Sequence, residues 1–468
     1  MNHNKMNTRK SRKLIALFLI ATLAVTCIGC SKKKTSSESY DAAIEKTFSG
    51  SSSLEELLGL EELAKKAESG AASSYGFTVN IQNLSGTVME GMEMLAGAGL
   101  SLDAATDANN KKSHATLGLN YAGATQFSLV EHLDGTKLSL GIPELFDGSI
   151  YVDFATLAED LKADTMMNSL LGLDSASLAE LDTYLEAFEQ ALAGTVVTDP
   201  LADTDLFKDL GSSLKVKSVK KSDITIPDGV SGKSFYNVTL PSESLADFLE
   251  ELIELSMSMQ PNEELAALSQ EDLDMAISSL SALLGDLSLN VAVNKDGYVT
   301  YMGNSFSMYG MEMFRLDMRF SGTKNPFDEF SFAFGTSASP NSAIIYDQVF
   351  DKSTGEFEVD CKLIADGSAI MTFGTAGSFS DVEKGKKFTV DFDYIELDVP
   401  GEMSLSFGAS FYLDTTKCEI PALTGPSYSF FYATEEELTM LAQEVMTSLY
   451  THPLLSGLLP EMGIPEFE

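Results

Sequence analysis

The first thirty residues combine a basic start, an apolar run and a cysteine, in an order that suits covalent modification of the cysteine. Five basic residues and no acidic residue precede the apolar run Leu14–Gly29. The thiol of Cys30 follows directly after the small residue Gly29. A basic segment, an apolar segment and a small residue in this order are typical of a cleaved export signal. Cys30 is therefore a candidate acceptor for a lipid at the start of a mature chain.

The four residues Cys27-Ile28-Gly29-Cys30 resemble the lipobox of bacterial lipoproteins, in which the last cysteine is lipidated. Cys27 departs from the family pattern, because Leu is commoner at that position. The resemblance implies a signal peptide over residues 1–29 and a lipid on Cys30. It also implies a protein anchored in the cell membrane by that lipid, on the extracytoplasmic face. Two acyl chains hold a protein stably in a bilayer, whereas a single chain does not.

A transmembrane anchor and an ordinary cleaved secretion signal are the two other interpretations of this segment. The apolar run of 16 residues reaches roughly 24 Å at ~1.5 Å per residue, which is less than the ~30 Å hydrocarbon core of a bilayer. The polar stretch Ser31–Ser37 begins directly after Cys30. Both observations favour the lipid-anchored interpretation.

The charge of the chain limits its partners. The formal net charge is −38, and it becomes −43 when the five basic residues of the signal are removed. The only arginines after Cys30 are Arg315 and Arg319, so the chain lacks the basic stripe that nucleic-acid binding needs. Lys32–Lys34 form a short basic cluster beside the predicted anchor, where each lysine adds about 1 kcal/mol of attraction to anionic lipid. We expect no nucleic-acid partner.

Motifs of nucleophilic and metal-dependent catalysis are missing from the sequence after Cys30. Its histidines are His114, His132 and His452, and none has His-Glu-x-x-His spacing. No Gly-x-Ser-x-Gly elbow occurs. Asp228–Ser234 ends like a phosphate-binding loop, but Pro227 stands where the first glycine belongs and no helical pattern follows. We therefore predict a protein that is not an enzyme and that needs no cofactor.

Two patterns could supply metal ligands, and each has an ordinary explanation. Met92 with Met94, and Met311 with Met313, are thioether pairs that suit Cu(I) if each pair shares a strand face. No His or Cys accompanies either pair, and flexible Met side chains also pack well in apolar interiors. The carboxylates of Asp391–Asp393 fit the wet face of an acidic sheet equally well. We predict no metal site.

Two cysteines remain as structural candidates after Cys27 and Cys30 are assigned to the signal. Cys361 and Cys418 both lie in apolar, alternating contexts. An exported protein can form a disulfide, and a free cysteine also packs as a small apolar residue. Both states are open from the sequence.

Apolar residues that alternate with polar or small ones predict strands that have one buried and one wet face. Strands are predicted at Phe77–Ile81, Leu117–Tyr121, Phe127–Leu129, Leu138–Leu140, Ile150–Val152, Leu287–Val293, Phe330–Phe334, Phe357–Leu363, Phe388–Val399 and Met403–Leu413, and a hairpin at Ser213–Leu240. Within Phe388–Val399 the apolar set changes parity between Tyr394 and Ile395, which indicates a bulge or bend.

Helical spacing interrupts these strands. It occurs at Leu54–Ala67, from about Phe154 to Leu192, from Ser242 to Leu284, and at Glu435–Tyr450. Thr434 and Glu437 have the spacing of a capping box at the start of the last helix.

The order of these patterns predicts the organisation of the chain. We expect a signal peptide at 1–29, a flexible tether at 30–53, a mixed sheet-plus-helix region at 54–284, a β-meander region at 285–433, and a C-terminal helix and tail at 434–468. The predicted fold class is α+β and β-rich, with a long curved, half-barrel-like antiparallel sheet and inserted helical hairpins.

The element order and the lipobox resemble Lol-type lipoprotein carriers and mycobacterial lipid-binding lipoproteins, over roughly residues 54–294. The resemblance implies a concave sheet face under a helix lid, which shelters a lipid or another apolar ligand. Its implied lining is Phe77, Val79, Leu117, Leu119, Phe127, Leu129, Phe154, Phe188 and Phe248. The alternatives are that these residues simply form a packed core, and that the protein is a non-enzymatic surface or scaffold protein that contacts another component of the cell envelope.

Overall fold

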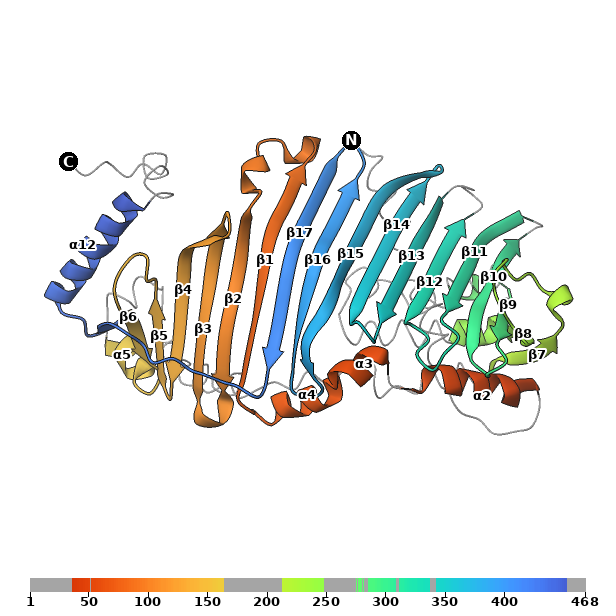
Figure 1. Ribbon diagram of the computed structural model, residues 1–468, viewed down its shortest axis with the longest axis horizontal. Helices are drawn as coiled ribbons and strands as arrows, with labels where there is room; N and C mark the ends of the chain where they lie inside the picture. Colours follow the sequence, from red (N-terminus) through yellow and green to blue (C-terminus); the bar gives the residue numbers. More distant parts are fainter. Residues whose placement is uncertain are drawn as a thin grey trace. The chain divides into compact units, whose positions relative to one another are not determined.

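A computed structural model describes residues 36–50, 52–163, 213–247, 275, 277–279, 281, 285–308, 311–336 and 342–452. The predicted signal peptide with Cys30, most of both central helical blocks, and Phe188 and Phe248 lie outside these residues. The described part is a β-rich α+β chain with long antiparallel sheet structure (Figure 1). The predicted α+β, β-rich fold class with a long antiparallel sheet is confirmed. The chain divides into two compact units that do not follow sequence order.

Unit 1 comprises residues 1–53, 198–353 and 357–373. Its strands pair with their sequence neighbours in antiparallel fashion from β7 to β13. The first two strands form the hairpin predicted over Ser213–Leu240. The strands of this unit are β7 (Lys215–Val219), β8 (Ser234–Leu240), β9 (Leu287–Val293), β10 (Val299–Met308), β11 (Met311–Phe320), β12 (Glu329–Thr336), β13 (Ser342–Asp351) and most of β14 (Glu356–Ala365).

Helix α2 (Ser36–Phe48) closes the core of unit 1, so the prediction of a flexible tether over this stretch is wrong. Tyr40 and Ile44 lie four residues apart, on one helix face, and both are buried with strand residues such as Met302. Thr47 adds a polar attachment, because its hydroxyl donates to the Ala43 carbonyl at 2.6 Å and accepts from the Val299 amide at 2.9 Å. Burial of two large side chains outweighs the low overall hydropathy of the segment.

Unit 2 comprises residues 54–197, 354–356 and 374–468. Its pairings run in the order β6, β5, β4, β3, β2, β1, β17 and β16, all antiparallel, and β18 pairs with β6 in parallel. The strands are β1 (Ser73–Ser85), β2 (Ala98–Asp107), β3 (Lys112–Tyr121), β4 (Ala124–Asp134), β5 (Lys137–Gly141), β6 (Ser149–Asp153), β16 (Lys387–Val399), β17 (Met403–Asp414) and β18 (Ser427–Ser429). Strand β15 (Ser368–Glu383) begins in unit 1 and ends in unit 2.

The parity change predicted in Phe388–Val399 is confirmed. The register of β16 against β17 shifts between Phe392 and Ile395. Asp393 and Tyr394 of β16 lie opposite the single residue Gly408 of β17, so β16 contains one extra residue. The apolar side chains on both sides of this bulge therefore stay on the same sheet face.

The helices of unit 2 precede, interrupt and follow its strands in the sequence. The predicted helix Leu54–Ala67 is two helices, α3 (Ser53–Leu58) and α4 (Leu60–Glu68), because Gly59 between them adopts a left-handed conformation with φ of 68°. A Cβ on Gly59 would lie 2.7 Å from the Gly385 amide nitrogen, so this break needs glycine. A short helix α5 (Leu157–Ala163) follows β6. Helix α12 (Glu435–Thr451) has the predicted Thr434–Glu437 capping box, which is confirmed.

Candidate apolar binding face

One side of strands β1 to β5 carries an ordered set of apolar side chains. Successive side chains of a strand point to opposite faces, so residues two apart share a face. We define the apolar face as Phe77, Val79, Leu100, Leu102, Leu117, Leu119, Phe127, Leu129 and Leu140.

The strand register aligns eight of these residues in two neighbouring rows. In the first row Phe77 pairs with Leu102, Leu102 with Leu117, and Leu117 with Leu129. In the second row Val79 pairs with Leu100, Leu100 with Leu119, and Leu119 with Phe127. The rows cross four strands, and adjacent strands lie about 4.8 Å apart.

Much of this face is exposed. Leu100, Leu117, Leu119, Leu129 and Leu140 have exposed fractions between 41% and 47%, and none of the nine residues is buried. Single exposed leucines are ordinary, whereas a contiguous exposed apolar patch marks an interaction surface. The arrangement can therefore bind an apolar molecule by burying the remaining leucine surface.

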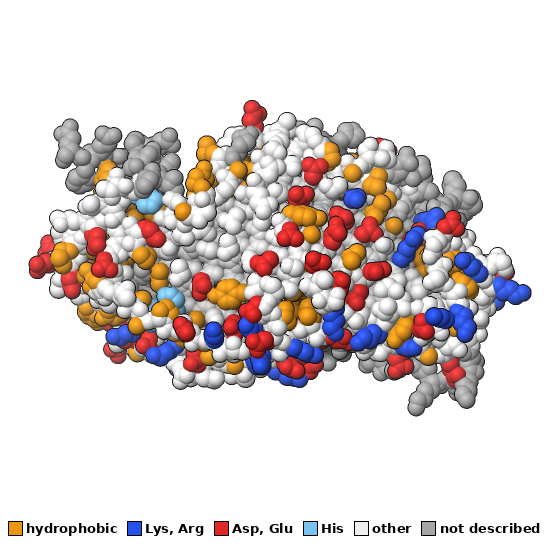
Figure 2. Space-filling model, in the orientation of Figure 1, with side chains coloured by type: hydrophobic (Ala, Val, Ile, Leu, Met, Phe, Trp, Pro, Cys, Tyr) orange, Lys and Arg blue, Asp and Glu red, His pale blue; other side chains and the backbone are white. Residues whose placement is uncertain are grey.

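The opposite side of the same strands is small and polar. It carries Asn80, Ser101, Thr116 and Ser128, whose side chains have the other parity. In Figure 2 the side of β1 to β4 that faces the viewer is mostly white, with few hydrophobic side chains. The sheet of unit 2 is thus amphipathic, as its period-two sequence predicts.

His114 on β3 and His132 on β4 lie on this polar side and are cross-strand partners. Their ring centroids are 5.9 Å apart, and the Nδ1 atoms of both are buried without a hydrogen-bond partner among the described residues. Burial lowers the pKa of both rings. The neighbouring His114 lowers the pKa of His132 further. The negative charges of Asp103 and Glu131 partly offset the lowering of the His114 pKa. Both imidazoles are consequently neutral at pH 7. Among the described residues, no third His, Cys, Asp or Glu completes a metal site with them.

Tyr412 on β17 fills another part of the polar side. A Cβ on Gly76 would lie 2.6 Å from Cε1 of Tyr412, so the ring passes directly over this glycine. Burial, followed by the negative charge of Asp103, raises the pKa of Tyr412 to about 12, and its hydroxyl hydrogen-bonds Asp103. The phenol therefore stays protonated and serves the packing of β1, β2 and β17.

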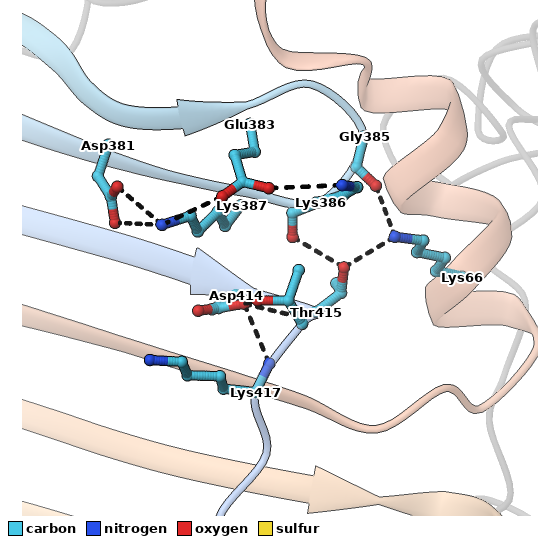
Figure 3. A network of polar contacts seen from close by, with 10 residues as sticks. Lys66, Asp381, Glu383, Gly385, Lys386, Lys387, Asp414, Thr415 and Lys417 are labelled. Atoms are coloured by element: carbon cyan, nitrogen blue, oxygen red, sulfur yellow. Dashed lines mark hydrogen bonds and ion pairs between the residues drawn. The ribbon is translucent and has the colours of Figure 1, made fainter.

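The N-terminal end of β16 and the C-terminal end of β17 carry a polar network that attaches α4 (Figure 3). The Lys66 ammonium donates to the Gly385 carbonyl at 2.7 Å and to the Thr415 hydroxyl at 3.0 Å. Lys387 pairs with Asp381 at 2.7 Å. Exposed ion pairs of this kind contribute about 0–1 kcal/mol each. The network holds the helix and the strand ends together.

Six of the sequence-predicted lining residues lie together on the apolar face: Phe77, Val79, Leu117, Leu119, Phe127 and Leu129. Phe154 is half-buried in the turn before α5, and Phe188 and Phe248 lie outside the described residues, as does the predicted lipidation site Cys30. Leu100, Leu102 and Leu140 belong to the face but were not predicted to line it. The alternation Leu100-Ser101-Leu102 is the signal that identifies the first two.

The other candidate residues form no site among the described residues. Met92 lies between two short 3-10 helices, η1 (Thr87–Met89) and η2 (Glu93–Leu95), rather than on a strand, and its side chain is exposed. Cys361 and Cys418 are both free thiols. Within the described ranges no group of three or more His, Cys, Asp or Glu could hold a metal ion, and no helix is long and apolar enough to cross a membrane.

Comparison with known proteins finds no matching family model and no matching curated protein. Solved structures align only weakly. Pseudomonas putida OprB is 5% identical, with 75% of this chain and 94% of that chain covered, at a TM-score of 0.12. Transferrin Binding Protein B from Haemophilus parasuis Hp5 is 9% identical, with 74% and 75% covered, at 0.11. Pseudomonas aeruginosa OccK5 is 10% identical, with 73% and 96% covered, at 0.10. Scores this low do not define a common fold and carry no functional argument.

Proposed function

We propose that the chain is a lipid-anchored lipoprotein of the extracytoplasmic face of the cell membrane, and that it binds a lipid or another apolar ligand on the apolar face. The lipobox-like segment ending at Cys30 supports the anchor. The observation that carries the binding proposal is the set of five half-exposed leucines in strand register on β2 to β5.

The energetics favour a bound apolar molecule. Complete burial of a leucine side chain is worth about 1.5–3 kcal/mol, and roughly half of that remains available at each of these positions. Several leucines covered together would supply several kcal/mol, before the ordering of the ligand is subtracted. The polar opposite side has no comparable surface, so binding is confined to one side of the sheet.

Native mass spectrometry of the full protein, extracted from membranes in a non-ionic detergent, tests the proposal. The expected spectrum contains a non-covalent apolar adduct that leaves on denaturation, while the covalent lipid on Cys30 remains. An adduct-free protein that also fails to bind an added long-chain alcohol would contradict the binding proposal. A mass without the covalent lipid would contradict the anchor.

A scaffold that contacts another envelope protein is the second candidate, and helix α12 supports it. None of its residues is buried, and Leu438 and Met440 are about half-exposed. A photo-crosslinking residue at position 438, used in intact membranes, would capture a protein partner if this function operates. Crosslinks to lipid alone, or no crosslinks at all, would count against the scaffold function.

A further inference from the structure

We infer that the ligand of the apolar face is an amphiphile with a cationic head group, which Glu131 binds; this inference rests on the proposed function. Glu131 lies on β4, two residues from Leu129, so its side chain belongs to the apolar face. Its register partners are Ala115 on β3 and Leu140 on β5. Glu131 as a residue is half-buried and has apolar neighbours on both adjacent strands.

Glu131 is the exception among the charged residues of these strands. In β1 to β5, all described, the charged residues are Asp103, Asp107, Lys112, Glu131, Asp134 and Lys137, and only Glu131 has the parity of the apolar face. On the polar side, Lys112 and Asp134 are cross-strand partners with an ion pair at 3.2 Å. Glu131 has no ion-pair partner among the described residues.

Among the described residues, no cation of the polar side forms an ion pair with this carboxylate, and Lys112 pairs with Asp134 instead. Burial lowers the pKa of both neighbouring imidazoles. Asp103 and Glu131 also act on the pKa of His114, and His114, Asp134 and Lys112 act on that of His132. The histidines are therefore uncharged at neutral pH. The Glu131 carboxylate lies in an apolar setting and can form a strong charge-assisted hydrogen bond with an ammonium group.

The charge of Glu131 selects among apolar ligands. A neutral ligand that covers Glu131 would bury an unpaired carboxylate, which is costly. A fatty acid or a phosphate head group would bring a second negative charge to a chain whose formal charge is already −38. A cationic head group instead pairs with Glu131 while its chain covers the leucine rows. From β4 to β1 the face extends over three strand spacings, about 14 Å, which suits one medium-length alkyl chain.

A matched set of probes tests this inference. Dodecylamine, dodecanol and dodecanoate have the same number of carbon atoms and differ in the head group, which is cationic, neutral and anionic, respectively. Each is added at neutral pH to the full protein, and the dissociation constant is measured by native mass spectrometry. Wild-type protein should bind dodecylamine about tenfold or more tightly than dodecanol, as expected for one hydrogen bond to a charged group. Dodecanoate should bind most weakly.

Two variants isolate the carboxylate. Glu131→Gln keeps the shape of the side chain and should abolish the preference for dodecylamine while it leaves the affinity for dodecanol similar or higher. Asp134→Asn removes a nearby carboxylate on the polar side and should leave the preference intact. Equal binding of all three probes, tightest binding of dodecanoate, or an unchanged preference in Glu131→Gln would overturn the inference and leave the apolar site standing. Failure of every probe to bind would overturn the proposed function itself.

Discussion

Substitution of two central leucines of the apolar face should weaken ligand binding by a calculable amount. Leu117 and Leu119 have exposed fractions of 41% and 47%. With about 1.5–3 kcal/mol for complete burial of a leucine, a covering ligand gains roughly 0.6–1.4 kcal/mol at each position. The Leu117→Ser/Leu119→Ser variant should therefore lose about 1.2–2.8 kcal/mol of binding free energy, which is roughly a 10- to 100-fold increase in the dissociation constant.

The assay is titration of the full protein with a neutral solvatochromic dye, whose fluorescence rises on transfer to an apolar site. About half of each leucine side chain is already buried in the folded protein. Removing both side chains should therefore also lower the unfolding free energy by about 2–3 kcal/mol. Circular dichroism must therefore confirm that the chain is folded at the temperature of the titration. Val349→Ser is the matched control, because Val349 is 50% exposed on β13 in the other unit.

Two results would refute the reasoning. A folded double variant that binds the dye as tightly as wild type would mean that the leucine rows are not the binding surface. An equal loss of affinity in Val349→Ser would mean that the dye reports exposed apolar residues in general.

The His114–His132 pair should make stability depend on pH: because burial lowers both folded pKa values below 6.5, its contribution is complete above pH 6.5 and is lost as pH falls through the folded values. Urea unfolding at pH 7.5 and 5 should show a smaller difference in the His114→Asn/His132→Asn variant than in wild type. Ile44→Ala should lower the unfolding free energy by about 2–5 kcal/mol, since Ile44 is 1% exposed, whereas Glu45→Ala on the exposed side of α2 should change it little. Thr434→Ala should destabilise α12 by about 1 kcal/mol, seen as faster amide exchange confined to that helix; unchanged exchange would contradict the role of the cap. Cys30→Ala should prevent incorporation of labelled palmitate and leave an uncleaved or soluble chain; continued labelling would contradict the lipobox interpretation.

Local patterns predicted much of the secondary structure. The alternation of Met403, Leu405 and Phe407 corresponds to β17, and the capping residues of α12 form the expected hydrogen bonds. These features depend on neighbours within a few residues, so the sequence specifies them directly. Helix α2 was missed because its apolar face is narrow: Tyr40 and Ile44 contact strands of unit 1 that begin more than 170 residues later. A short polar segment with two large apolar residues is indistinguishable from a tether until its partner is known.

The amino-acid sequence by itself determined which side chains share a face, because the period of two is a property of each strand alone. It placed Phe77 and Val79, Leu117 and Leu119, and Phe127 and Leu129 on common faces in pairs. Only the tertiary structure decided that these pairs lie side by side, since register between strands depends on contacts that are remote along the chain. The same register places Glu131 among Ala115, Leu140 and the leucine rows, whereas in the sequence it is one acidic residue among 69 Asp and Glu. Whether an apolar row is a packed core or an open surface depends on what covers it, and that is a property of the folded chain.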